Sequence, residues 1–406
     1  MVQIVASQLM YLFPGVGSHH SGMGKTLYEQ FPLVQDLFTE ASDILHRDIA
    51  ALCFSSAHAE DLNYLENSQA ALLCVSVATY RVLVAETGLE QALYLGYSLG
   101  EYSALCCAGA LAFKDALQLV WNRGIIVSEV AKTVDGSMVW VVNVAERKVE
   151  EICQQLRQEG ESVSISAYDS PQKVSISGTR AALRKAGERI VAAGGIPIPI
   201  KMSGPFHSPL MSDAAARFRD LLHTYSYASP RFPVISNYTA QLYQSGDDIP
   251  ANLQLQLVQP IRWQASLELA RSLGVTTSVE IGPKNVLTYL LEKNEFHITT
   301  YELNTTEQLQ KIKASSVAQS RDYPAFLAKC LTLIVGTKNY NEDVHMYETI
   351  VIPNFRKIEA TYMAVQAGNL MPDEQLYAHT LTLLTDALRA KKLKESDIHA
   401  RLQRLG

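Results

Sequence analysis

Basic charge is scarce and scattered in this 406-residue sequence. Its 35 lysines and arginines are outnumbered by 41 acidic residues, the net charge is −6, and no long Lys/Arg run occurs. Proteins whose main partner is a nucleic acid or an anionic membrane usually carry a basic patch, so we expect neither partner. An anionic substrate is compatible with this balance, because one or two well-placed cations are enough to bind it.

Targeting, metal and cofactor signals are equally sparse. The N-terminal segment has no basic region before its apolar stretch, which argues against a secretory signal. No nucleotide-binding fingerprint is present, and six cysteines occur without CxxC or Cys/His metal spacing, at positions 53, 74, 106, 107, 153 and 330. We therefore predict a cytoplasmic protein with buried thiols, no metal and no permanently bound cofactor.

The longest apolar run, 70–85, still contains polar residues. Ser76, Thr79, Tyr80 and Arg81 interrupt it, so it predicts a buried helix and not a membrane span. Apolar residues make up 48% of the chain and charged residues 19%, a composition typical of a protein with a sizeable packed core. The length allows one large domain or two to three ordinary ones.

The N-terminal part has the alternation of an α/β fold. The run LMYLF at 9–13 predicts a strand that ends in a glycine loop, and helical periodicity follows over 22–38 and 68–87. A second strand at 92–95 leads into GYSLG and then into a helix over 101–108. We expect an α/β-hydrolase-like core with a parallel sheet.

The pattern changes over residues 137–195. It predicts strand, helix, strand, strand, helix and strand in that order, which is typical of the ferredoxin-like split motif. After Asn304 the sequence becomes polar and then rich in helix formers. The predicted domains are a core of residues 1–136 and 199–310, an inserted ferredoxin-like subdomain of residues 137–198, and a helical C-terminal extension of residues 311–406.

The strongest local signal is the pentapeptide GYSLG, with Ser98 at its centre. A serine between two glycines at a strand-to-helix turn is typical of a nucleophile elbow. There the sharp turn exposes the hydroxyl, and the helix N-terminus stabilises an oxyanion. The alternative is a tight helix-entry turn in which Ser98 only caps the helix. The order of strand, glycine-flanked serine and helix favours the catalytic interpretation.

A serine nucleophile needs a general base. His207 is the best candidate among ten histidines, because it lies in a Pro- and Gly-bounded loop where a strand passes to a helix. His19 and His20, in the first glycine loop, are its rivals, and spacing alone does not choose among the three. A loop histidine without catalytic duty is the further alternative.

Eight segments carry a family resemblance. In order they are FPGVGSHHSGMG (13–24), ENSQAALLCVSVA (66–78), GYSLGEYSALCCAGAL (96–111), NRG (122–124), AYDSPQKVSISG (167–178), SGPFHSPLM (203–211), QLVQPIRW (256–263) and EIGPKNVL (280–287). With them the chain resembles the malonyl-CoA:acyl carrier protein transacylases. It resembles more closely the freestanding, trans-acting acyltransferases of polyketide and lipopeptide synthases.

The resemblance implies roles for the residues at matching positions. Ser98 would form the acyl-enzyme. His207 would be the general base, oriented by the backbone carbonyl of Gln256 in place of an acidic third residue. The backbone N–H groups of Val16 and Leu99 would form the oxyanion hole.

The same resemblance implies a malonyl pocket. Arg123 matches the arginine whose guanidinium binds the free carboxylate of malonate through paired hydrogen bonds, although by itself it could be a solvated helix arginine. Gln69 matches a polar residue near the pocket. Phe206 matches the bulky residue of malonyl-selecting members, which crowds a methyl branch and favours malonyl over methylmalonyl.

Five positions depart from the family's usual residues. Val16 replaces a Gln, which a backbone contact tolerates, and Lys284 replaces a Gly in a loop. Tyr97 replaces the His that flanks the nucleophile, so we expect this pocket residue to alter pocket shape or acyl preference. Ala167 and Asp169 stand where Asn is usual, and we expect altered polar contacts at the subdomain cleft.

The implied activity is ping-pong transfer of malonyl from malonyl-CoA to the phosphopantetheine thiol of an acyl carrier protein, in polyketide, lipopeptide or fatty acid biosynthesis. The alternatives are an editing hydrolase that releases stalled acyl groups from carrier proteins, and an acyltransferase for a different acyl group. Arg123 favours malonyl transfer. A carrier-docking module with a dead site is a non-enzymatic alternative, which Ser98 and His207 argue against. Residues 311–406 are a candidate contact for other synthase components.

Overall fold

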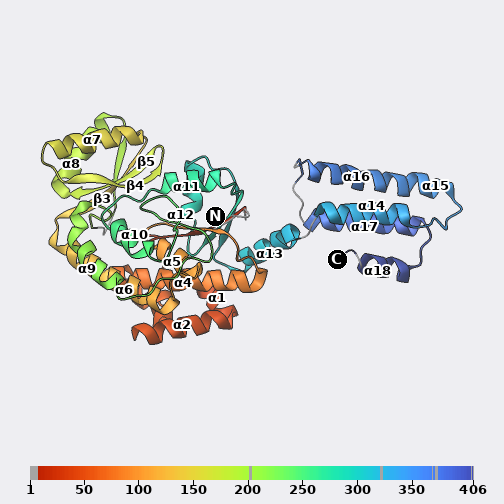
Figure 1. Ribbon diagram of the computed structural model, residues 1–406, viewed down its shortest axis with the longest axis horizontal. Helices are drawn as coiled ribbons and strands as arrows, with labels where there is room; N and C mark the ends of the chain where they lie inside the picture. Colours follow the sequence, from red (N-terminus) through yellow and green to blue (C-terminus); the bar gives the residue numbers. More distant parts are fainter. Residues whose placement is uncertain are drawn as a thin grey trace. The chain divides into compact units, whose positions relative to one another are not determined.

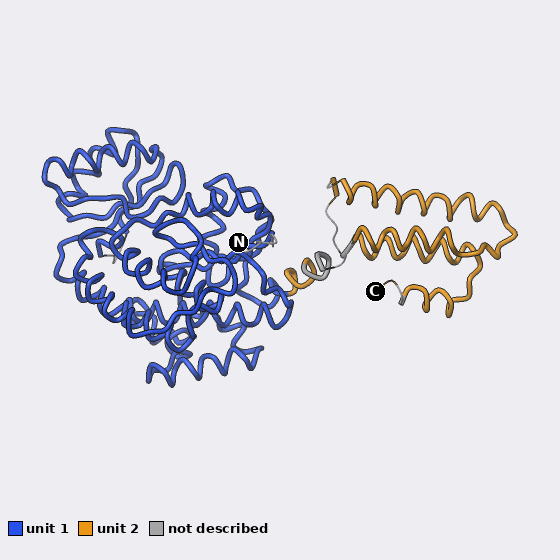
Figure 2. Tube along the Cα trace, in the orientation of Figure 1, with its two compact units in different colours: residues 1–309 blue, residues 310–406 orange. Residues whose placement is uncertain are grey.

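A computed structural model describes residues 8–200, 204–320, 323–367, 369–370, 374–403 and 405. Residues 1–7 of the N-terminal segment that lacks a secretory signal pattern lie outside the described residues. The chain divides into two compact units, residues 1–309 and residues 310–406 (Figure 2). The boundary falls within helix α13 (Thr306–Ser320).

Sheet A of the first unit is a five-stranded parallel sheet with the strand order β7-β2-β1-β8-β9. Its strands are β1 (Leu9–Phe13), β2 (Leu93–Gly96), β7 (Val234–Ile235), β8 (Thr277–Ile281) and β9 (Thr299–Leu303). The prediction of an α/β fold with a parallel sheet is confirmed. The two strands predicted near its start are β1 and β2.

Helices cover both faces of this sheet (Figure 1). The helices of this part of the unit, in chain order, are α1 (Lys25–Gln30), α2 (Pro32–Leu45), α3 (Ile49–Phe54), α4 (Leu65–Thr87), α5 (Gly100–Cys107), α6 (Phe113–Thr133), α9 (Ser212–Leu222), α10 (Asp248–Gln256), α11 (Trp263–Ser272) and α12 (Val286–Lys293). The alternation of side chains along β1 explains the layers. Met10 and Leu12 pack in one cluster with α11 and α12, whereas Tyr11 and Phe13 contact Tyr80 of α4 on the other face.

Helix α4 is, among the described helices, the one long and apolar enough to cross a membrane by length and composition. In this structure 72% of its apolar window is buried. The prediction of a buried helix over the apolar run 70–85 is confirmed.

The prediction of a single helix over residues 22–38 is wrong, because the structure has two helices there, α1 and α2. The break is at Phe31, which is extended (φ −119°, ψ 112°) immediately before Pro32. Proline disfavours a helical residue before it but is tolerated at the first position of a helix. Helical periodicity continues across such a break, so the pattern alone does not reveal it.

The inserted segment forms an antiparallel sheet B with the strand order β4-β5-β3-β6. Its elements are β3 (Gly136–Val142), α7 (Glu146–Gln158), β4 (Val163–Ser170), β5 (Lys173–Thr179), α8 (Arg180–Ala192) and β6 (Ile196–Pro199), as the sequence pattern predicted. Apolar residues of α7, α8 and the strands share one core.

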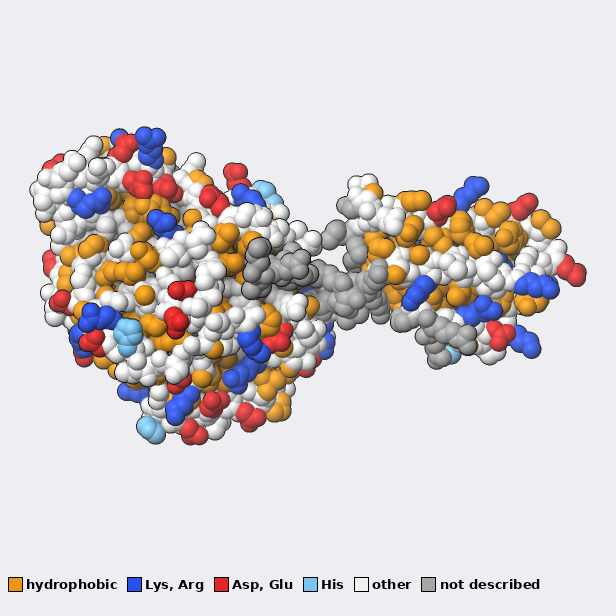
Figure 3. All heavy atoms as spheres, in the orientation of Figure 1, with side chains coloured by type: hydrophobic (Ala, Val, Ile, Leu, Met, Phe, Trp, Pro, Cys, Tyr) orange, Lys and Arg blue, Asp and Glu red, His pale blue; other side chains and the backbone are white. Residues whose placement is uncertain are grey.

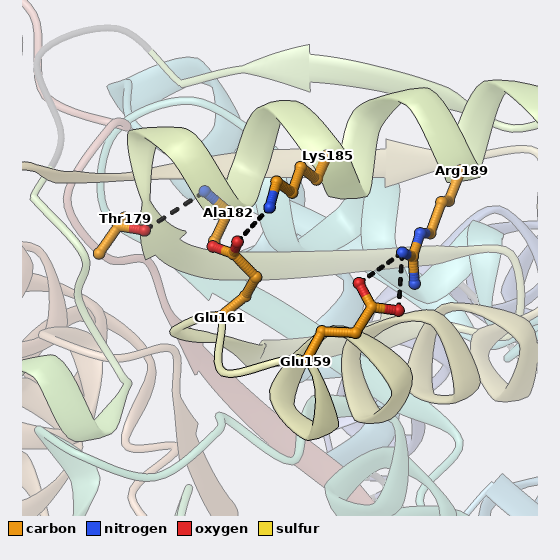
Figure 4. A network of polar contacts seen from close by, with 6 residues as sticks. All are labelled: Glu159, Glu161, Thr179, Ala182, Lys185 and Arg189. Carbon is orange, nitrogen blue, oxygen red and sulfur yellow. Dashed lines mark hydrogen bonds and ion pairs between the residues drawn. The ribbon is translucent and has the colours of Figure 1, made fainter.

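Ion pairs join α8 to the end of α7 and the turn after it (Figure 4). Arg189 binds both carboxylate oxygens of Glu159, at 2.8 and 2.6 Å, and Lys185 pairs with Glu161. Thr179 caps α8 by accepting the N–H of Ala182. Each pair has at least one side chain that is about half exposed, Lys185 at 54% and Glu159 at 48%. The ion pairs therefore add little to stability, and the shared apolar core holds the helices on the sheet.

The second unit is helical and has a core of its own. Its elements are α14 (Tyr323–Gly336), α15 (Val344–Met346), a π-helical turn (Tyr347–Val351), α16 (Ile352–Gln366), α17 (Glu374–Ala390) and α18 (Glu395–Gln403). Buried Lys391 donates to the carbonyls of Ile334 and Thr337 at the end of α14, where a cation complements the helix dipole. Apolar side chains are prominent on this unit in Figure 3, and Val335 is 71% exposed.

Candidate active site

Ser98 lies in a sharp turn between β2 and α5, and its φ of +52° lies in the left-handed region. The flanking glycines are required by packing. A Cβ on Gly96 would lie 2.0 Å from the backbone of Gly100, and a Cβ on Gly100 would lie 1.9 Å from the carbonyl oxygen of Phe13. The Ser98 N–H donates to Asn237 Oδ1 at 2.6 Å. The sequence therefore builds a strained, pinned turn, as expected of a nucleophile elbow.

His207 lies beside this serine. Its Nε2 is 2.9 Å from Ser98 Oγ, and its Nδ1 is 2.7 Å from the backbone oxygen of Gln256. A carbonyl only accepts, so Nδ1 carries the proton and Nε2 is left to accept from the serine hydroxyl. Burial lowers the pKa of His207 to about 4, helped by the positive charge of Arg123 and opposed by the bond to Gln256. The imidazole is therefore neutral near pH 7 and able to take a proton.

The rival histidines have other neighbours. His19 Nδ1 accepts the N–H of Gly17 at 3.3 Å, and His20 Nδ1 is 3.4 Å from the Ser18 oxygen. Of the three candidates, the structure brings His207 to Ser98.

Two backbone N–H groups are available near the elbow. The loop of Val16 packs closely on it, since a Cβ on Gly15 would lie 2.5 Å from the Tyr97 oxygen. Within the described part of the chain, neither the Val16 N–H nor the Leu99 N–H donates a hydrogen bond. The Leu99 N–H lies at the start of α5 and the Val16 N–H in the loop after β1. Unsatisfied backbone N–H groups of this kind are the donors that an oxyanion hole requires.

Arg123 of α6 is buried, at 5% exposure. Its Nη1 donates to Gln69 Oε1 at 2.9 Å and its Nη2 to Gln256 Oε1 at 3.3 Å, while its Nε has no partner. Both partners are neutral, and none of the ion pairs between described residues involves Arg123. A buried cation without a counter-charge is costly, so the site fits a ligand that brings a carboxylate.

A close helix contact positions that arginine. A Cβ on Gly124 would lie 2.4 Å from the Glu66 Cα, so α6 can approach α4 only with glycine here. The approach brings Arg123 of α6 and Gln69 of α4 into hydrogen-bond contact.

Two further predicted pocket residues contact sheet B. The Tyr97 hydroxyl donates to buried Asp169 at 2.6 Å, and its ring lies 5.4 Å from that of Trp263. The Phe206 carbonyl, next to His207, accepts from Ser177 Oγ at 2.6 Å. Two departures from the family pattern, at 97 and 169, are thus partners in one contact. Burial raises the pKa of Asp169, and the positive charge of Lys173 and then the hydroxyl of Tyr97 oppose that rise.

Two buried side chains of the site, Glu101 and Asn237, were not predicted from the sequence. Glu101 accepts from Gln256 Nε2 at 2.5 Å, and burial raises the pKa of its carboxyl to about 7. Asn237, after β7, holds the elbow by accepting from Ser98 and donating to the Gly96 oxygen. A glutamate in an otherwise apolar helix was an available signal for Glu101, but nothing local marks Asn237. Among the described residues, no group of three or more His, Cys, Asp or Glu side chains is arranged to hold a metal.

Comparisons with known proteins identify the family of this chain. The chain belongs to the acyl transferase domain family, which it matches over residues 10–322. It is 33% identical over 390 residues to a malonyl CoA-acyl carrier protein transacylase of Bacillus subtilis, covering 95% of this chain and 97% of that one. It is 36% identical over 299 residues to the Escherichia coli K12 protein of the same name, covering 73% of this chain and 96% of that one.

The chain is also similar to a solved structure. That structure is a type II polyketide synthase acyl-carrier protein in complex with its malonyl-transacylase. The match has a TM-score of 0.72 and 36% sequence identity, and covers 75% of this chain and 98% of the solved chain.

Proposed function

We propose that this protein transfers a malonyl group from malonyl-CoA, through an ester on Ser98, to the phosphopantetheine thiol of an acyl carrier protein. The observation that carries the proposal is the buried, carboxylate-free Arg123 beside the Ser98–His207 pair. A guanidinium fork binds a free carboxylate with two hydrogen bonds, and malonyl carries one where acetyl carries none. The relatives' names support the same donor and acceptor.

In the first half-reaction, Ser98 Oγ attacks the thioester carbonyl carbon while its proton passes to His207 Nε2. The Gln256 carbonyl stabilises the resulting imidazolium through Nδ1–H. The N–H groups of Val16 and Leu99 stabilise the tetrahedral oxyanion. The carbon–sulfur bond then breaks, the CoA thiolate takes the proton from His207, and a malonyl ester is left on Ser98.

The second half-reaction runs the same steps in reverse. His207 Nε2 takes the proton of the carrier's phosphopantetheine thiol, and the thiolate attacks the malonyl ester. The carbon–oxygen bond to Ser98 breaks and the serine recovers its proton from His207. Phe206, next to the base, disfavours a methyl branch at the α-carbon, although one such contact gives only about 1–3 kcal/mol of discrimination.

The malonyl transfer is distinguished from an editing hydrolase by the fate of the ester. Wild-type protein mixed with radiolabelled malonyl-CoA should keep the label, Ser98→Ala should not take it up, and an added carrier protein should remove it. Release of the label as free malonate without a carrier would favour the hydrolase. Efficient loading from an acyl-CoA without a free carboxylate would favour a different acyl group.

We also propose the fold type and the bounds of each domain. The strand order of sheet B and its β-α-β-β-α-β sequence support a ferredoxin-like subdomain of residues 137–198 in an α/β-hydrolase-like core of residues 1–136 and 199–310. We propose a cytoplasmic, trans-acting acyltransferase with a Ser–His dyad and no resident cofactor. Residues 311–406 form the extension, with other synthase components as candidate partners.

A further inference from the structure

Glu101 lies one turn beyond Ser98, and three hydrogen-bond donors meet at its carboxylate. The side chain is fully buried. Its Oε1 accepts the backbone N–H of Asn237 at 3.1 Å and the hydroxyl of Tyr243 at 2.6 Å. Its Oε2 accepts from Gln256 Nε2 at 2.5 Å. Both oxygens therefore face donors, which an ionised carboxylate satisfies because it only accepts.

The second partner of Gln256 Nε2 is the Ser98 carbonyl oxygen, at 2.9 Å. A carbonyl and a carboxylate both accept, so the group between them must be the amide nitrogen of Gln256. The amide oxygen is thereby turned away from Glu101, toward Arg123, whose Nη2 it accepts at 3.3 Å. Gln69 accepts from the other Nη, so two amide oxygens orient one guanidinium.

We infer that Glu101 is a positioning residue for substrate selection, acting through the side chain of Gln256 to hold the Arg123 guanidinium in its carboxylate-binding orientation. This inference deepens the proposed malonyl transfer and rests on it. Gln256 then has two roles. Its backbone carbonyl holds His207, and its side chain links Glu101 to Arg123.

Glu101→Gln is a sharp test because it keeps the shape and changes one oxygen into an NH₂ group. Wherever that NH₂ points, it meets a donor, either the fixed backbone N–H of Asn237 or the movable amide of Gln256. The Gln256 amide is the group that moves, and its oxygen then no longer accepts the hydrogen bond from Arg123 Nη2. We expect the ratio of kcat/KM for malonyl-CoA to that for acetyl-CoA to fall about tenfold, the effect of one lost hydrogen bond to a charged group.

Tyr243→Phe is the matched control. It removes a donor to the same carboxylate but leaves the Gln256 contact intact, so it should keep the malonyl-to-acetyl ratio even where it lowers stability. A purely structural role for Glu101 would lower both kcat/KM values equally in Glu101→Gln, and an unchanged ratio in the folded variant overturns the inference. A wild type without preference for malonyl-CoA contradicts the proposed function instead.

A second variant keeps the inference testable if Glu101→Gln does not fold. Gln256→Leu removes the amide and retains the backbone carbonyl that orients His207. It should lower the malonyl-to-acetyl ratio as Glu101→Gln does, and adding it to Arg123→Ala should lower the ratio no further. A Gln256→Leu protein that still selects malonyl-CoA overturns the inference.

Discussion

At the scale of single residues, the chemistry depends on the protonation state of buried groups. His207 is neutral because burial and the charge of Arg123 both disfavour its protonated form. Its pKa of about 4 lies below the ordinary histidine value of 6.5. A general base works when deprotonated, so its contribution is present above the folded pKa and is lost as the pH falls through it.

The lowered pKa of His207 predicts that the reactivity of Ser98 depends on pH and that the charge of Arg123 shifts this dependence. Labelling of Ser98 by an uncharged fluorophosphonate should persist in the wild type well below pH 6.5. In Arg123→Ala the acid limb should move to higher pH, because one cause of the lowered His207 pKa is gone. Both proteins retain Glu101, so the difference between the two profiles reports the charge of Arg123. Superimposable profiles would contradict the electrostatic account of His207.

A second prediction concerns the pair of departures at positions 97 and 169. Tyr97→Phe leaves the buried Asp169 carboxylate without its 2.6 Å donor, which should lower the free energy of unfolding by about 1–3 kcal/mol. Tyr97→Phe combined with Asp169→Asn should cost less than the sum of the single changes, measured by urea denaturation in a double-mutant cycle. Additive effects would mean that the contact contributes no coupling.

At the scale of elements, the crossing of α6 and α4 sets the position of the guanidinium. Gly124→Ala places a Cβ against the Glu66 backbone at 2.4 Å. We expect a loss of about 1–3 kcal/mol of stability by overpacking, with weaker malonyl selection because Arg123 moves relative to Gln69. Urea denaturation and the malonyl-to-acetyl ratio measure the two effects.

Gly187 provides the control for that substitution. It lies within helix α8, and a Cβ there would meet its nearest neighbour, a Pro197 ring carbon, at an ordinary 3.7 Å. Gly187→Ala should therefore be neutral or stabilising, by up to about 1 kcal/mol from helix propensity. Equal destabilisation by both alanines would show that the α6–α4 contact is not special.

Whether a feature of the fold or site can be predicted from sequence depends on how far apart along the chain the interacting residues lie. The elbow, the first two strands of the parallel sheet and the β-α-β-β-α-β segment have local patterns, and each of these was predicted from the sequence. The choice of His207 over His19 and His20 needed the family resemblance, because it depends on a contact across 109 positions. The bonds from Glu101 to Asn237 and from Tyr97 to Asp169 join residues 136 and 72 positions apart, and no local pattern encodes such pairs.

At the scale of the whole molecule, the residues of the candidate active site all belong to the first unit, and the second unit has its own apolar core. The Bacillus subtilis relative matches 95% of this chain, which requires a counterpart for part of residues 310–406, whereas the Escherichia coli relative matches 73%. Part of the second unit therefore has a sequence counterpart in the Bacillus subtilis relative.

This division predicts the behaviour of a truncated chain. A protein ending at residue 320 should fold and load Ser98 from malonyl-CoA at a rate within about twofold of the full chain, because it keeps every group of the site and the core beneath it. Loss of loading in a truncated protein with an intact circular dichroism spectrum would assign the second unit a part in the site. Stopped-flow or quenched-flow loading measures the rate.

The most direct test of the central claim is a competition for Ser98. Wild type and Arg123→Ala are each mixed with equal concentrations of malonyl-CoA and acetyl-CoA, and the Ser98 peptide is analysed by mass spectrometry. The account predicts malonyl on Ser98 in the wild type. It also predicts that Arg123→Ala shifts the malonyl-to-acetyl ratio by about 100-fold toward acetyl, the value of two charge-assisted hydrogen bonds worth roughly 3 kcal/mol. An unchanged ratio, or malonyl on a residue other than Ser98, would contradict it.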